Sequence, residues 1–233
     1  SSISSQFLTV PSINGYDINK SLENLIPNNL TMCVDDILKT SDLILFAVPS
    51  NKEILSLIEN KKIKKNSILI DLTTSDPKDT IEINKKLKLR NINFYDVAMS
   101  GGALGAKNGT LTLMVGAKKN DLKSIEKILK AMSSNIFYYG SIGSGHLMKL
   151  LHNSVCHGIF MMMCEVGNLA EEAGISIDDL IKTFNCSNAR SYISQERFPK
   201  HILNEKYDGN FLIKNLQKDL NMIKKYSNTK NTS

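Results

Sequence analysis

Buried strands and helical segments alternate along the first 140 residues of this chain. Leu43 to Val48 (LILFAV) is a continuous apolar run, and residues 67–72 (SILIDL) repeat the pattern. Such runs predict strands that are buried on both faces of a parallel sheet. Residues 93–99 and 111–117 are further strand candidates, and helical spacing of apolar residues occurs between the strands, over 20–26, 34–39, 52–58, 81–89 and 121–132. We therefore expect an α/β domain with right-handed crossovers.

The pattern changes after Gly145. From His146 to Ala173 the chain has no proline, and glycine occurs only at 158 and 167, which predicts one long buried helix. A helix of about 28 residues spans about 40 Å, so we expect it to connect two domains and to face a second subunit. Residues 175–185, 191–198 and 212–226 predict further helices without strands. The expected division is an α/β domain, residues 1–142, and an all-helical domain, residues 143–233.

Composition argues against several classes of protein. The net charge is +6, but it comes from 26 Lys and only 3 Arg spread along the chain, whereas nucleic-acid surfaces cluster Arg among aromatic residues. No apolar run approaches the roughly 20 residues of a membrane span. The first residues lack the basic and apolar regions of a signal peptide. The four cysteines form no Cys-x-x-Cys pair, which predicts reduced thiols in a cytoplasmic protein without a metal site.

A glycine motif follows one of the predicted strands. Ser100, Gly101 and Gly102 open the segment SGGALGAKNGT. Consecutive glycines expose backbone N–H groups that can bind a carboxylate, and the serine hydroxyl is a further donor. The alternative is a glycine turn that joins two strands.

A lysine and an asparagine share one face of the long helix. Lys149 and Asn153 are four residues apart in GSIGSGHLMKLLHN, so their side chains can converge on one atom. A partly desolvated lysine can take the proton of a hydroxyl group while hydride leaves the carbon. The alternative is one surface lysine among many, which the apolar neighbours of Lys149 disfavour.

With residues 70–77 (IDLTTSDP), these two segments form three blocks that resemble the signature blocks of the β-hydroxyacid dehydrogenases. The resemblance runs in order from about Asp17 to Leu220. It implies a Rossmann-like, mostly parallel sheet domain, here incomplete, and hydride transfer between NAD or NADP and a small β-hydroxy acid. It assigns the acid/base role to Lys149, an orienting role to Asn153 and substrate contacts to Ser100, Gly101 and Gly102. His152 stands where the family commonly has Asn, as a titrating group or a packed imidazole.

The resemblance also implies cofactor contacts. Val48, Pro49 and Thr74 would edge the cofactor crevice at the carboxyl ends of two strands. Asp17 would meet the adenosine ribose, which favours NAD, although it could equally be a turn residue. Phe211 and Lys218 would close the site from the helical domain. A solvated helix face is the alternative for Lys218 and Asp219.

The family's Gly-x-Gly-x-x-Gly turn, which binds the cofactor pyrophosphate, does not occur in this sequence. Two hypotheses follow. One is an oxidoreductase that acts on a small carboxylic acid and forms a homo-oligomer through the long helix. The other is a cofactor-deficient remnant that serves as a binding or dimerisation module.

Overall fold

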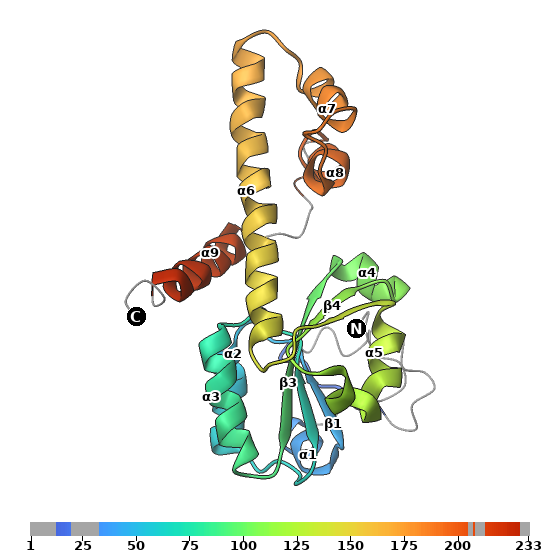
Figure 1. Ribbon diagram of the computed structural model, residues 1–233, viewed down its shortest axis with the longest axis vertical. Coiled ribbons are helices and arrows are strands. Elements are labelled where there is room, and N and C mark those ends of the chain that lie inside the picture. The colour runs from blue at the N-terminus through green and yellow to red at the C-terminus, as the bar shows by residue number, and fades with distance from the viewer. Residues whose placement is uncertain (1–12, 20–32, 205–206, 208–212, 229–233) are drawn as a thin grey trace. The chain divides into compact units, whose positions relative to one another are not determined.

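The computed structural model describes residues 13–19, 33–204, 207 and 213–228, and divides the chain into two compact units, Ser1–Lys149 and Leu150–Ser233 (Figure 1). The helix expected at residues 20–26 lies outside the described residues. We expected the division between residues 142 and 143. It falls later because the first turn of the long helix α6 (Ser144–Glu172) is bound to the sheet of the first unit.

The first unit contains a five-stranded sheet in the order β1-β2-β3-β4-β5. The β3–β4 pair is antiparallel and the other three pairs are parallel, which confirms the mostly parallel sheet. Residues 135–138 were not predicted as a strand, because they alternate between exposed and half-buried side chains and form no buried apolar run. The strands are β1 (Leu43–Phe46), β2 (Ile68–Asp71), β3 (Asn93–Ser100), β4 (Thr112–Val115) and β5 (Asn135–Tyr138).

Helices cover both faces of this sheet. Neighbouring residues of β2 point to opposite faces, so Leu69 belongs to one core and Ile70 to the other. The Leu69 core is shared with α1, α2 and α3, and the Ile70 core with η3 and α5, as the sequence pattern predicts for strands buried on both sides. The helical elements are α1 (Val34–Thr40), α2 (Asn51–Asn60), α3 (Pro77–Lys88), α4 (Gly102–Asn108), η3 (Lys119–Ile125) and α5 (Glu126–Met132).

Two of these helices begin with side-chain caps just after a strand. Ser50 and Glu53 form a capping box at the start of α2. Asp76 accepts the N–H of Lys78 at 3.0 Å and is followed by Pro77 at the first helical position of α3. The caps therefore fix where the chain turns at the carboxyl ends of β1 and β2.

The second unit is helical. It contains most of α6, then α7 (Ile177–Asn185), a π-helical turn η4 (Ile193–Arg197), α8 (Phe198–His201) and α9 (Ile213–Asn228). Its core is formed by Met163, Ile181, Ile193 and Phe198. The long helix was expected to be buried, but one side of it is exposed, because the described helices of the second unit pack against the side that carries Asn153, His157 and Met163. Within the described residues, no helix has the length and apolar character needed to cross a membrane.

Candidate functional site

The carboxylate of Asp96, in the middle of β3, holds the start of α6. Asp96 is fully buried and accepts the N–H of Gly143 at 2.8 Å and the N–H of His146 at 2.9 Å. A negative charge at a helix N-terminus is favourable, because the free N–H groups there carry partial positive charge. The first turn of α6 is thus fixed against the strand that ends at Ser100.

Two glycines make this approach possible. A Cβ atom on Gly116 would lie 2.1 Å from the Asp96 Oδ1, and one on Gly145 would lie 2.4 Å from the carbonyl oxygen of Met114. Neither distance leaves room for an atom, so the sheet and α6 pack backbone against backbone here. Gly145 belongs to the block that resembles the family, whereas our sequence analysis did not single out Gly116.

A second buried cluster joins α3 and β2 to the same turn of α6. The Thr80 hydroxyl lies 2.7 Å from His146 Nδ1 and donates to the carbonyl oxygen of Asp76 at 3.0 Å. His146 Nε2 lies 3.8 Å from the carboxylate of Asp71, which accepts the N–H of Thr73 at 2.8 Å. Sequence reasoning missed this cluster, because its members are distant in the chain.

The glycine motif lies where β3 gives way to α4. Ser100 is half-buried and pairs in register with Thr112, and Gly101 and Gly102 are exposed. Their φ angles are +124° and +61°, which L side chains rarely adopt, so the backbone conformation requires glycine. The loop leads into a short helix before the next strand and is therefore not a simple turn between two strands. Lys149 lies in the same unit, half-buried, about one turn into α6.

Asn153, in the second unit, is held by a buried carboxylate. Its Nδ2 donates to Asp219 Oδ2 at 2.6 Å, and His157 Nε2 lies 3.6 Å from the same oxygen. Lys218 is half-buried, with its Nζ 3.8 Å from Asp219 Oδ1. The alternative of a solvated helix face is wrong for Asp219, which is only 5% exposed. The sequence analysis did not single out His157, which lies one turn after Asn153 on the same helix.

The candidate cofactor residues lie at the ends of β1 and β2. The N–H of Val48 reaches the Thr73 hydroxyl at 3.5 Å; Pro49 is exposed and Thr74 half-buried. Among the described residues, nothing hydrogen-bonds the buried Asn51 Nδ2, at the start of α2. An amide donor without a partner suits a ligand that presents acceptor oxygens, so this edge fits a cofactor.

Two of the predicted cofactor contacts remain to be placed, Asp17 and Phe211. Asp17 is half-buried, and its Oδ1 accepts the N–H of Asn19 at 2.8 Å, as in the turn that we considered as its alternative role. Phe211 lies outside the described residues. Over the described ranges, no group of three or more His, Cys, Asp or Glu side chains is arranged to hold a metal ion.

Comparison with known proteins identifies the family. Residues 12–140 match the model for the NAD binding domain of 6-phosphogluconate dehydrogenase, and residues 143–232 match that for the NAD-binding domain of NADP-dependent 3-hydroxyisobutyrate dehydrogenase. The chain belongs to the β-hydroxyacid dehydrogenase family. The predicted resemblance is confirmed, and NAD or NADP is the cofactor of this family.

Individual relatives are consistent with this family assignment. The mitochondrial 3-hydroxyisobutyrate dehydrogenase of Rattus norvegicus is 31% identical over 169 residues, which are 70% of this chain and 50% of the rat protein. The 2-(hydroxymethyl)glutarate dehydrogenase of Eubacterium barkeri is 26% identical over 194 residues, 78% of this chain and 62% of that protein. This β-hydroxyacid dehydrogenase homologue thus spans about half the length of its rat relative.

Solved structures confirm the fold. A 3-hydroxyisobutyrate dehydrogenase from Salmonella typhimurium superposes with a TM-score of 0.86 at 20% identity, covering 98% of this chain and 83% of that one. The Mycobacterium tuberculosis 3-hydroxyisobutyrate dehydrogenase with L-serine gives 0.83 at 18% identity, covering 100% of this chain and 84% of that one. The Rossmann-like domain followed by a helical region is therefore the fold of this chain.

Proposed function

We propose that this chain is an oxidoreductase that transfers hydride between NAD or NADP and a small β-hydroxy acid of the 3-hydroxyisobutyrate type. The observation that carries the proposal is the anchoring by Asp96. This carboxylate joins β3, which ends in the Ser100 to Gly102 loop, to the first turn of α6, which leads to Lys149. A carboxylate-binding loop and an acid/base group are thus built on two elements that are fixed to each other.

In this mechanism the loop binds the carboxylate of the substrate through its exposed backbone N–H groups and the Ser100 hydroxyl. Lys149 takes the hydroxyl proton during oxidation and returns a proton to the carbonyl oxygen during reduction. Asn153 is the orienting residue, and its hydrogen bond to Asp219 keeps its amide in one orientation. The nicotinamide, when bound, accepts or supplies the hydride.

We assign the cofactor to the ends of β1 and β2. Val48, Pro49 and Thr74 edge this site in the proposal, and the buried, unpartnered amide of Asn51 supports it, because such a donor is costly without an acceptor. Asp17 remains a proposed ribose contact. Phe211 and Lys218 remain proposed contacts from the second unit.

The first experiment is a fluorescence titration with NADH and NADPH, followed by a panel assay with hydroxyisobutyrate, tartronate semialdehyde, threonate and succinic semialdehyde. We expect one dinucleotide to bind below millimolar concentration and one acid to turn over. Absence of binding of either dinucleotide at millimolar concentration would reject the enzyme interpretation for this chain.

Lys149→Ala tests the acid/base role. We expect kcat to fall by at least about 10²-fold, with the dissociation constant of the dinucleotide unchanged, because the lysine acts on the substrate proton and not on the cofactor. Lys62→Ala, at an exposed lysine after α2, is the matched control and should keep both values. An equal loss of turnover and cofactor affinity would contradict the assigned role.

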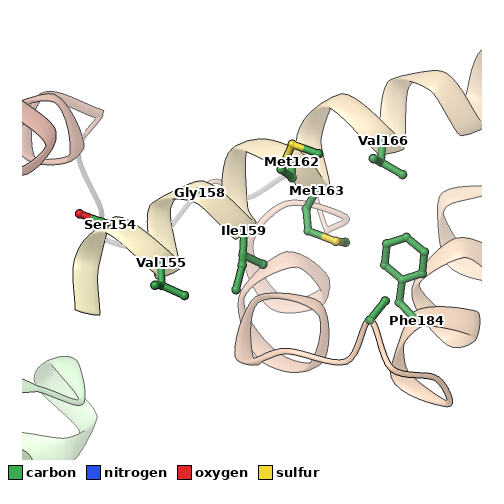
Figure 2. A pocket seen from close by; sticks show the side chains of 9 residues that line it. Ser154, Val155, Gly158, Ile159, Met162, Met163, Val166 and Phe184 are labelled. Carbon is green, nitrogen blue, oxygen red and sulfur yellow. The ribbon is translucent and has the colours of Figure 1, made fainter. Parts of the chain in front are cut away.

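We also propose that a second copy of this chain covers the exposed side of α6. This side carries exposed apolar residues at helical spacing, namely Leu151, Val155, Ile159, Met162 and Leu169. A cavity of about 490 Å³ lies along it, where Met163 and Phe184 also contribute side chains (Figure 2). If the chain binds no cofactor, this surface supports the second hypothesis, a dimerisation module.

A further inference from the structure

Four polar side chains of the second unit form a hydrogen-bonded series that ends at a thiol. Asn153 Nδ2 lies 2.6 Å from Asp219 Oδ2, and its Oδ1 lies 3.0 Å from His152 Nδ1. His152 Nε2 in turn lies 3.7 Å from the sulfur of Cys156, one turn further along α6. The Cys156 thiol is therefore hydrogen-bonded to His152 Nε2, while His152 Nδ1 is hydrogen-bonded to Asn153.

The direction of each hydrogen bond follows from the chemistry of the groups. A carboxylate oxygen only accepts, so the amide nitrogen of Asn153 must face Asp219 and the amide oxygen must face His152. An amide oxygen also only accepts, so His152 Nδ1 must carry the hydrogen. In the neutral imidazole, Nε2 then has a lone pair directed at Cys156, and the thiol donates its hydrogen to it.

This is the arrangement that activates a nucleophile. The thiol has a base within hydrogen-bond reach, and a third group fixes the tautomer and orientation of that base. Asn153 and Asp219, which set the tautomer of His152, are both buried: Asn153 is only 8% exposed and Asp219 only 5%. Cys156 itself is half-buried, and it is not among the residues that line the cavity on the exposed side of α6.

Another cysteine of the same helix has a different environment. Burial, with a smaller effect from the charge of Glu165, raises the pKa of the Cys164 thiol. Cys164 is half-buried like Cys156 and lies two turns beyond it, packed against the core of the second unit. The two thiols therefore share a helix and a similar degree of exposure, and of the two only Cys156 lies within hydrogen-bond distance of a histidine among the described residues.

We propose that Cys156 is a reactive thiol that His152 activates, and that it forms a mixed disulfide with low-molecular-weight disulfides. The Cys156 proton moves to His152 Nε2, and the thiolate sulfur attacks one sulfur of the disulfide. A new S–S bond forms as the old one breaks, and the leaving thiolate takes the proton back from the imidazolium. Cys156 is oxidised, half of the disulfide is released as a free thiol, and the histidine is regenerated.

The test exposes the reduced chain to glutathione disulfide at pH 7 and follows each cysteine by peptide mass spectrometry. We expect the adduct on Cys156 to form about tenfold faster than on Cys164, and dithiothreitol to reverse it. Equal rates at the two positions would overturn the proposal without the need for any variant.

Variants of His152 and Cys156 then separate activation of the thiol from simple exposure. His152→Asn, the residue common in the family, should slow modification of Cys156 about tenfold and leave Cys33 and Cys186 unchanged. Cys156→Ser should remove that adduct alone. His152→Gln repeats the test if His152→Asn does not fold, as judged by circular dichroism. An unchanged Cys156 rate in a folded His152 variant would show that the imidazole does not activate the thiol.

Discussion

At the scale of single residues, the missing side chains of two glycines decide how closely β4 and α6 approach β3. Gly116 and Gly145 lie against the Asp96 carboxylate and the Met114 carbonyl oxygen, at distances that no Cβ atom tolerates. Their neighbours are a buried charged group and backbone, which cannot rotate away as the end of a flexible side chain can. These positions should therefore be among the least tolerant of substitution in the chain.

Gly116→Ala is predicted to lower the free energy of unfolding by about 3 kcal/mol, because the new methyl group displaces the carboxylate that holds α6. Gly167→Ala is the matched control. Its Cβ would meet Phe198 and Ile177 at 3.9 and 4.0 Å, ordinary contact distances, so the gain in helix propensity should stabilise the protein by about 0.5–1 kcal/mol. Urea unfolding measures both, and equal stabilities of the two variants would contradict the steric argument.

At the scale of elements, two helices of the first unit, α2 and α3, begin where a side-chain cap accepts one of their free N–H groups. The Ser50 side chain accepts from the first turn of α2, and the carboxylate of Glu53 accepts the N–H of Ser50 at 3.0 Å. The start of α6 is different, because the carboxylate that accepts its N–H groups belongs to Asp96 on β3. Asp96 lies 47 residues before Gly143 and 50 residues before His146 in the chain.

Ser50→Ala is predicted to cost about 1 kcal/mol of unfolding free energy at pH 7. The hydrogen bond from the Ser50 hydroxyl holds the pKa of Glu53 below its ordinary value of 4.5. Because the pKa of Glu53 is lowered in the folded state, the stability that comes from the hydrogen bond between Ser50 and the ionised Glu53 is fully present above pH 4.5. It is lost as the pH falls through the lowered pKa. The difference between wild type and variant, measured by urea unfolding, should therefore shrink on acidification. A constant difference from pH 7 to pH 3 would show that the ionised Glu53 plays no part.

At the scale of the whole molecule, the exposed apolar side of α6 is the surface that we propose is covered by a second copy of this chain. Large exposed apolar patches on soluble proteins mark interaction sites, and a second copy of this chain offers the same stripe in return. The Met162 side chain lies on the stripe and is 63% exposed, whereas Met161 is 52% exposed and faces away from it.

We predict a dimer by size-exclusion chromatography with light scattering at micromolar concentration. Met162→Asp should convert it to a monomer, because a buried unpaired charge is costly at an interface. Met161→Asp should leave the dimer intact. A wild-type chain that stays monomeric would contradict the proposal, as would equal dissociation of both variants.

The sequence by itself determined four of the five strands, the change to an all-helical second part and the family. Continuous apolar runs in 43–48 and 67–72 require burial on both faces, and the uninterrupted segment after Gly145 permits only a helix. The resemblance to the family nominated Lys149 and Asn153 as candidate residues, and their spacing of four residues places them on one face of the helix.

Only the tertiary structure decided which distant residues meet. The Asp96 carboxylate at the start of α6, the Asp219 carboxylate on Asn153, the antiparallel β3–β4 pair and the edge strand β5 leave no local pattern. The spacing of apolar residues along a segment indicates which of its faces is buried, because each face is formed by residues that are close together in the chain. Contacts across 50 or 66 residues depend on the path of the whole backbone, which local periodicity does not encode.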